Sequence, residues 1–263
     1  MTAKILGKPD NLDAIGKQFA RARLQQPVLL NAIPKSGTHL IRNIMRMFVD
    51  QSQHWPGEFI QHAILRQSLP AFSQTSPHIS WGHLLFSDEA SVALRDVRHI
   101  VLVRDPYSWV LARARFYLSD EFQGNLNHIK GGAAPLSDIL NMMILGVHGR
   151  VPSLLDIYTF NAVAWMNDRT TLVRYEDIVE NVQDIGSSRA ETFFAELLAK
   201  CGIDLPADWR DKVEAGADRR ESRTASENLT YTGPEVPRVL PEQQKKTLDF
   251  HAPGLRPLLG YLD

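Results

Sequence analysis

The sequence VLLNAIPKSGTHL, at residues 28–40, joins an apolar run to a short polar loop and then to a helical pattern. The apolar run predicts a buried strand, and the loop after it holds Lys35, Gly37 and two hydroxyl side chains. A glycine permits a tight backbone curl with inward-pointing N–H groups, and a helix carries about half a positive charge at its N-terminus. Because the lysine adds a full positive charge, the segment predicts a loop that grips phosphate.

Length and composition are those of a globular enzyme or binding protein. The chain has 263 residues, 44% of them hydrophobic, and we expect one domain spanning residues 1–263. The formal net charge of −1 gives no broad basic surface, so we expect no nucleic-acid partner. Cys201, the only cysteine, excludes an intrachain disulfide, and its place before Gly202 predicts the buried last turn of a helix.

No targeting or membrane signal is recognisable. The opening sequence MTAKILGKPD lacks an apolar signal core, and no stretch approaches the ~18 apolar residues of a membrane span. We therefore expect a cytoplasmic protein with no transmembrane segment.

Apolar runs alternate with helical patterns along the chain. Buried strands are predicted at residues 27–33, 99–103 and 170–173, with a less regular candidate at 78–85. Helices are predicted at residues 38–50, 107–118, 153–167 and 188–201. This alternation predicts an α/β fold, a central parallel sheet flanked by helices in a P-loop-like three-layer architecture. Such sheets bind ligands beyond the carboxyl ends of their strands.

Two further segments have no such pattern. Residues 119–152 hold GNLNHIKGGAAPL and then an apolar run, and are interpreted as a lid next to an acceptor site. Residues 222–241 are rich in Ser, Thr, Gly and Pro and are expected to be irregular. Apolar residues that form either an acceptor pocket or plain core are Phe116, Tyr117, Phe122, Met142, Met143 and Ile144.

The loop differs from the P-loop of nucleoside triphosphatases. That motif reads G-x-x-x-x-G-K-[ST], and its hydroxyl after the lysine holds magnesium. Here Lys35 precedes Gly37, and Ala32 stands where the first glycine belongs. An ATP-dependent kinase or hydrolase, using Lys35, Thr38 and a magnesium-binding Asp105, is kept as an alternative.

The sequence PKSGTHL closely resembles the PKSGTTW loop of sulfotransferases that use 3′-phosphoadenosine 5′-phosphosulfate (PAPS). The resemblance implies sulfuryl transfer from PAPS to a hydroxyl, with adenosine 3′,5′-bisphosphate as product and no metal. By position, Lys35 is catalytic and contacts the bridging oxygen, where it stabilises charge only as the bond breaks. The implied phosphate cradle comprises Ser36, Gly37, Thr38 and His39, and Leu40 takes the place of a tryptophan that packs on adenine.

The histidine in Trp81-Gly82-His83-Leu84 resembles the short T-H-L motif of the same family. The resemblance implies that His83 is the base that removes the acceptor's hydroxyl proton, a role worth ~10²–10⁴ in rate. His78 is the next choice.

Two later segments resemble further family signatures. Arg104, in VRDP, follows a predicted strand as in the family's R-[ND]-P element, which implies that it binds the 3′-phosphate. An ion pair with Asp105 is the structural alternative for this arginine. Tyr175, in the segment RYED, resembles a tyrosine that lies near the nucleotide, which implies contact with the adenosine part.

Three departures point to a divergent or bacterial-type member. Ala112 stands where the family has a serine on the 3′-phosphate, and Ser108 and Arg113 are candidates to replace it. Leu40 is the second departure. The third is the absence of a recognisable C-terminal R-K-G-x-x-G element. Candidates to supply its positive charge lie just upstream, at Arg219, Arg220 and Arg223. A nucleotide-binding module without catalysis is therefore a further alternative, and the acceptor, a small molecule, lipid or carbohydrate, stays open, as does the oligomeric state.

Overall fold

The structure is a computed structural model that describes residues 4–5, 10–124, 126–222, 228–230 and 233–261. Internal contacts divide the chain into two compact units. The sheet unit comprises residues 10–103 and 160–221, and the helical unit comprises residues 1–9, 104–159 and 222–263. The boundary at 103–104 falls directly after one of the expected strands.

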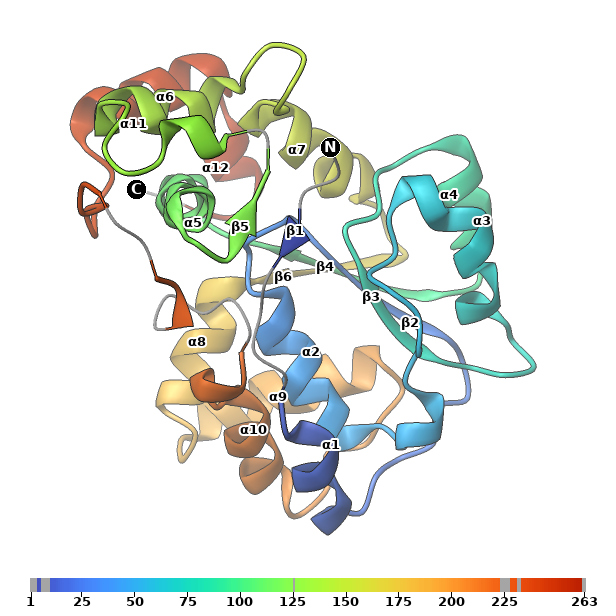
Figure 1. Cartoon of the computed structure of the whole chain (residues 1–263). Helices are drawn as coiled ribbons and strands as arrows, with labels where there is room; N and C mark the ends of the chain where they lie inside the picture. Colours follow the sequence, from blue (N-terminus) through green and yellow to red (C-terminus); the bar gives the residue numbers. More distant parts are fainter. Residues whose placement is uncertain (1–3, 6–9, 125, 223–227, 231–232, 262–263) are drawn as a thin grey trace. The chain divides into compact units, whose positions relative to one another are not determined.

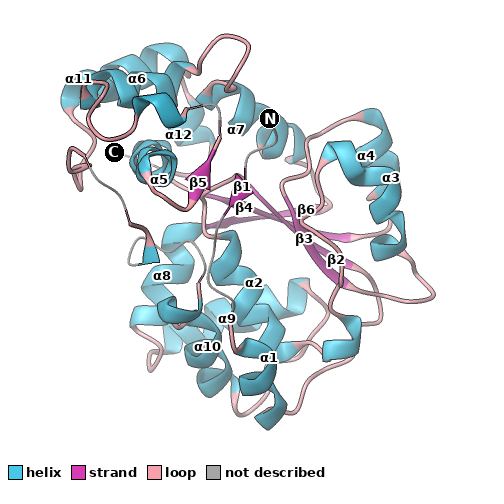
Figure 2. Cartoon of the chain, viewed as in Figure 1, coloured by secondary structure: helices cyan, strands magenta, loops and turns pink. Residues whose placement is uncertain are grey.

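The sheet unit is built on a four-stranded parallel sheet in the order β3-β2-β4-β6 (Figure 2). Its strands are β2 (Val28–Ala32), β3 (Ile79–Gly82), β4 (Arg98–Val103) and β6 (Thr170–Arg174). Leu30 of β2 pairs with both Trp81 and Ile100, so β2 is a central strand. Burial on both faces explains why β2 is apolar at every position except Asn31. All four expected strands are present, the fourth shorter than predicted.

Helices cover one face of this sheet (Figure 1). They are α1 (Leu12–Ile15), α2 (Thr38–Phe48), α8 (Tyr175–Gln183), α9 (Ser188–Lys200) and α10 (Trp209–Ala217). Ile41, Ile44 and Phe48 recur at helical spacing on α2 and are buried against the sheet. Gly216 lets α10 approach α2 closely, since a Cβ there would lie 2.5 Å from the Cα of Ile44.

The opposite face of the sheet carries aromatic and polar groups. Trp165, in the short helix η6 (Val163–Trp165), packs edge-on against His99 of β4, with ring centroids 4.8 Å apart. The remaining short helices of the unit are η1 (Gly16–Gln18), η2 (Gln51–Gln53), η3 (His62–Ile64), α3 (Leu65–Ser68), η4 (Leu69–Phe72), α4 (Asp88–Ala93) and η7 (Arg219–Glu221).

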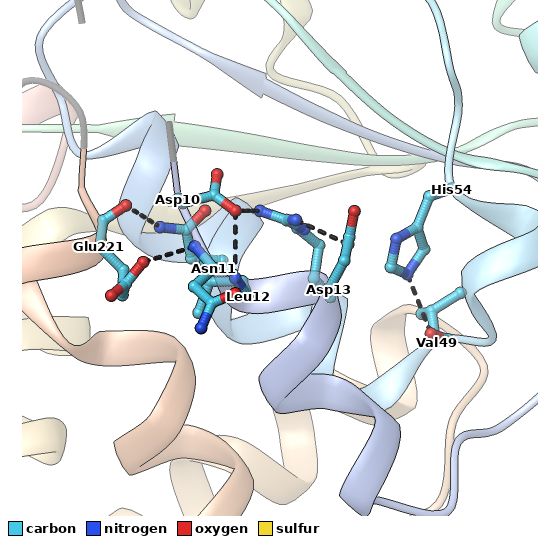
Figure 3. A network of polar contacts seen from close by, with 9 residues as sticks. Asp10, Asn11, Leu12, Asp13, Val49, His54 and Glu221 are labelled. Carbon is cyan, nitrogen blue, oxygen red and sulfur yellow. Dashed lines mark hydrogen bonds and ion pairs between the residues drawn. The ribbon is translucent and has the colours of Figure 1, made fainter. Parts of the chain in front are cut away.

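A polar network fastens the start of the sheet unit to α2 (Figure 3). Arg46, only 5% exposed, forms ion pairs with Asp10 at 2.9 Å and Asp13 at 2.7 Å. The N–H of Asn11 donates to a carboxylate oxygen of Glu221 at 2.7 Å. A charge buried this deeply requires such partners, so the network fixes residues 10–13 to the C-terminal half of α2.

The helical unit is formed mainly by helices. These are α5 (Pro106–Leu118), α6 (Leu136–Leu145), α11 (Glu242–His251) and α12 (Leu255–Leu258), with α7 (Leu154–Asn161) crossing the boundary between the units. Helix α6 packs against both α5 and α11. A two-stranded antiparallel ribbon pairs β1 (Lys4–Ile5) with β5 (Phe122–Gln123), and η5 (Asn127–Ile129) follows it.

The segment interpreted as a lid, 119–152, contains β5, η5 and α6 in its described part. Four of the proposed acceptor-pocket residues are buried within the helical unit: Phe116, Phe122, Met143 and Ile144. Tyr117 and Met142 are partly exposed. For the four buried residues the structure matches the plain-core interpretation, while a lid role for the segment stays a prediction.

Two helix ends differ from the sequence pattern. Helix α2 stops at Phe48 rather than residue 50 because Val49 is extended and bridges to Ala22. The helix expected at 153–167 ends at Asn161, and η6 follows it. Cys201 ends α9 fully buried, with Gly202 at φ +75°, as predicted. In the part of the chain that is described, no helix is long and apolar enough to cross a membrane.

Candidate functional site

The loop after β2 holds an unusual backbone. Lys35 has φ +70°, and among the described residues it is the one non-glycine residue with a positive φ. The turn is closed by the N–H of Ser36, which donates to the carbonyl of Ile33 at 3.1 Å. A left-handed conformation costs a residue with a side chain about 1–3 kcal/mol, and such strain gathers at functional sites. The fold therefore holds Lys35 in a conformation that local preferences oppose.

The loop leads into the N-terminus of α2, an 11-residue helix that begins at Thr38. Its N-cap is Gly37, and no described side chain caps it. The first N–H groups of a helix have no carbonyl acceptor inside the helix, and its positive end attracts anions. The Ser36 hydroxyl is fully buried and has no hydrogen-bond partner within the described ranges. The loop thus contains polar groups that suit a phosphate.

Tyr175 lies directly against this loop. It is the first residue of α8, after β6, and a Cβ built on Gly37 would lie 2.4 Å from its ring atom Cδ2. The structure therefore brings Tyr175 and the loop together, as expected for residues at the carboxyl ends of parallel strands. Position 37 has room for glycine alone.

His83 follows β3, the neighbour of β2. Its Nδ1 lies 2.8 Å from the carbonyl oxygen of Ala32. Because a carbonyl only accepts, Nδ1 carries the proton, and the neutral ring keeps a free lone pair on Nε2. Burial lowers the pKa of His83 below 6.5, and the charge of Lys35 lowers it further, while the Ala32 bond opposes both. The imidazole is thus close to Lys35 and neutral at neutral pH.

His78, the alternative base, lies at the amino end of β3, at the opposite end of the strand from His83. It packs edge-on against Trp55 with centroids 5.6 Å apart. The structure therefore separates His78 from the Lys35 loop and brings His83 to it.

Two residues around His83, Phe59 and Asn31, were not predicted from the sequence. The ring of Phe59 lies 5.5 Å from the imidazoles of both His39 and His83, nearly parallel to the latter at 29°. Buried Asn31 of β2 bonds to the backbone beside His83. Nothing in the sequence marks Phe59, but an asparagine inside an apolar strand signals a buried polar group that needs partners.

In the helical unit, Arg104 precedes α5. Its Nε donates to the Ser108 hydroxyl at 2.8 Å, and its carbonyl accepts from the Tyr158 hydroxyl at 2.8 Å. Asp105 caps α5 by accepting the N–H of Tyr107 at 3.0 Å, and it pairs with Arg256 at 3.1 Å. The carboxylate of Asp105 is thus engaged in the helix cap and in an ion pair with Arg256.

Ala112 lies one turn after Ser108 on α5, on the same face. Of the two candidates to replace its missing hydroxyl, Ser108 contacts Arg104 directly. Arg113 is 3% exposed and donates to the carbonyls of Met143 and Pro152 at 2.9 and 3.0 Å. Arg113 therefore bonds within the interior of the helical unit, so of the two candidates the structure places Ser108, and not Arg113, in a hydrogen bond with Arg104.

The remaining residues singled out in the sequence are Leu40 and the arginines near residue 220. Leu40 is partly exposed and packs against the core under the sheet. Arg219 lies in η7, and Arg220 forms an ion pair with Asp218 at 2.6 Å. Arg223 lies outside the described residues. Across the described ranges, no group of three or more His, Cys, Asp or Glu residues is arranged to hold a metal ion.

The solved structures that are similar to this chain include two complexes with PAP. The crystal structure of mouse sulfotransferase SULT7A1 complexed with PAP has a TM-score of 0.52 and 16% identity, covering 93% of this chain and 88% of that one. Retinol dehydratase in complex with androsterone and inactive cofactor PAP has a TM-score of 0.52 and 14% identity, covering 92% and 83%. No family model and no curated protein matches the sequence. At these identities the likeness shows the fold: the chain has the P-loop-like α/β fold of sulfotransferases.

Proposed function

We propose that the protein is a PAPS-dependent sulfotransferase that acts on a hydroxyl acceptor. The observation that carries the proposal is the meeting of Lys35 and His83 at the ends of adjacent strands β2 and β3. Sulfuryl transfer requires a cation that stabilises the leaving phosphate oxygen and a neutral base that accepts the proton of the attacking hydroxyl. Lys35 and His83 supply this pair in one site.

The chemistry follows from the states of these two side chains. Nε2 of His83 accepts the acceptor's proton as the hydroxyl oxygen attacks sulfur, a base role that its lowered pKa permits near neutrality. The amine of Lys35 stabilises the phosphate oxygen that gains charge as the sulfur–oxygen bond breaks. PAPS supplies the sulfuryl group, and no step requires a metal.

Donor binding is assigned to the loop and to two further residues. The fit to phosphate rests on the buried, unsatisfied Ser36 hydroxyl and on the uncapped start of α2. We assign the 5′-phosphosulfate to the loop residues 35–39, the adenosine part to Leu40 and Tyr175, and the 3′-phosphate to Arg104. Ser108 is the candidate to supply the hydroxyl that Ala112 lacks. A cytoplasmic location, a single domain and a lid at 119–152 remain predictions within this proposal.

A competition binding experiment tests the donor. The experiment compares the binding of four nucleotides: PAPS, adenosine 3′,5′-bisphosphate, ATP and GTP. It is carried out on the wild type, on Lys35→Ala and Arg104→Ala, and on Lys246→Ala as an exposed control. We expect selectivity for the two 3′-phosphorylated ligands, lost in Arg104→Ala and kept in the control. Magnesium-dependent ATP turnover that survives His83→Ala would instead indicate the kinase or hydrolase. Tight binding without transfer to a broad acceptor panel would indicate a binding module.

A further inference from the structure

Asn31 is a buried side chain that clamps the backbone next to His83. It is 0% exposed and lies in the apolar strand β2. Its Nδ2 donates to the carbonyl of Leu84 at 3.0 Å, and its Oδ1 accepts the N–H of Leu84 at 2.8 Å. One amide thus satisfies both backbone groups of a single residue, and the carbonyl also accepts from Trp165 Nε1 at 3.2 Å.

The clamp begins where strand pairing stops. Asn31 pairs with Gly82, the last residue of β3, and beyond it the side chain of Asn31 replaces the strand backbone as the partner of the chain. On the other side, the N–H of His83 donates to the carbonyl of Ile60 at 2.9 Å. The backbone of residues 83–84 is therefore held from both sides, one bond coming from residue 60 and two from Asn31.

We propose that Asn31 is the positioning residue for His83, holding the imidazole over the Ala32 carbonyl so that Nδ1 is protonated and Nε2 is free. The bonds between Asn31 and Leu84 lie next to the bond between His83 and Ala32, because Asn31 precedes Ala32 and Leu84 follows His83 in the chain. The role of His83 as a base rests on the proposed function, but the positioning does not. Free histidine prefers the opposite tautomer, with the proton on Nε2, so the Nδ1–H tautomer inferred from the bond to Ala32 needs this support.

Three residues surround the His83 imidazole and influence its titration. Lys35 is the cation that acts on it, Phe59 covers one ring face, and His39 lies across Phe59. None of these is changed by replacing Asn31, so a change in the titration or tautomer of His83 reports the clamp.

The test is a histidine NMR titration that needs no turnover, with the His83 signal assigned by its loss in His83→Gln. In the wild type we expect Nδ1–H and a pKa below 6.5. Asn31→Ala is expected to raise this pKa toward 6.5 and to shift the ring toward Nε2–H. The matched control is Ser80→Ala, which removes another buried β3–β2 bond, from the Ser80 hydroxyl to the Val28 carbonyl at 3.2 Å. It should leave both signals unchanged.

A second variant covers a failure of Asn31→Ala to fold. Asn31→Asp keeps the size and the acceptor for the Leu84 N–H but removes the donor to the Leu84 carbonyl. Its carboxylate raises the pKa of His83 directly, so the tautomer is the readout in this variant, and it should shift toward Nε2–H. A folded Asn31→Ala with an unchanged pKa and tautomer, or a folded Asn31→Asp with an unchanged tautomer, would overturn the proposal. With an acceptor in hand, Asn31→Ala should lower kcat roughly 10- to 100-fold and leave the KM for PAPS near its original value. Absence of PAPS binding would defeat the proposed function and leave the NMR result standing.

Discussion

The ring of Tyr175 lies so close to Gly37 that a methyl group on Gly37 would sit 2.4 Å from Cδ2. Gly37→Ala should therefore both strain a φ of +94° and displace the ring, weakening adenosine 3′,5′-bisphosphate binding by about tenfold or more. Calorimetric titration measures this. Gly131→Ala, at φ +65° with nothing beyond its own chain neighbours within 4 Å of the new methyl, serves as the control for an alanine that is strained but meets no ring. Recovery of binding in Gly37→Ala/Tyr175→Ala would show that the tyrosine contributes nothing to affinity.

The charge of Lys35 is one of the causes that lower the pKa of His83, after burial. Removing that charge in Lys35→Met should raise the pKa, because the imidazolium no longer faces a neighbouring cation. NMR titration measures the change even if the variant is inactive, and Lys246→Met serves as the exposed control. In active protein the same pKa should set the acid limb of kcat/KM, which falls as His83 becomes protonated. An acid limb unrelated to this pKa would remove His83 from the base role.

Loss of Arg46 should destabilise the sheet unit strongly. Arg46→Met leaves Asp10, whose side chain is 13% exposed, without its cation, and we expect a loss of about 3–5 kcal/mol in the free energy of unfolding. Arg189→Met removes the exposed pair with Glu180 and should cost about 0–1 kcal/mol. Urea denaturation of both variants checks the contrast, and equal losses would contradict it.

The same network has a pH signature. Burial raises the pKa of Asp13, but the hydrogen bond and charge of Arg46, together with the charges of His54 and Arg42, outweigh it, so the pKa lies below 3.8. The stabilisation is therefore complete above the unfolded value and disappears as the pH falls through the lower folded value. Wild type and Arg46→Met should accordingly approach one another in stability below about pH 3.8. A constant difference down to the acid transition would argue against this pair.

His99 makes stability depend on pH in a second window. Burial lowers its pKa to about 3, whereas the unfolded imidazole takes up a proton near 6.5. Stability should therefore fall with acidification between these values, by about 1.4 kcal/mol per pH unit for this residue. His99→Leu should remove that part of the slope, and His128→Leu, an exposed control, should keep it. Unfolding curves at several pH values give both slopes.

The sheet and its main loop are predictable because their signals are local. The apolar run at 28–32, the glycine at 37 and the amphipathic pattern after it each specify one element, and all three agree. The helix expected at 153–167 fails because a distant contact overrides propensity. The chain leaves the α-helical path after Asn161, and Trp165 in η6 donates to the carbonyl of Leu84, 81 residues earlier in the chain.

Within the candidate site, the residues that stand out in the sequence are those whose proposed chemistry needs a particular residue type. Lys35 and His83 carry charge or titrate, so their types and positions stand out in the sequence. Phe59 belongs to the site because its ring lies beside the imidazoles of His39 and His83. No pattern of residue spacing in the sequence predicts this contact. Ser108 and Arg113 show the limit: both lie near Arg104 in sequence, and only the direction of the side chain from α5 separates a partner of Arg104 from a core cation.

Cys201 gives the molecule a built-in reporter. Its thiol is 1% exposed, and burial raises its pKa to about 12, so a thiol reagent reacts only when the chain opens. A nucleotide that binds the native state slows such opening in proportion to its affinity and concentration. Candidate donors can thus be ranked by labelling rate on the untagged, unmutated chain, before any acceptor has been found.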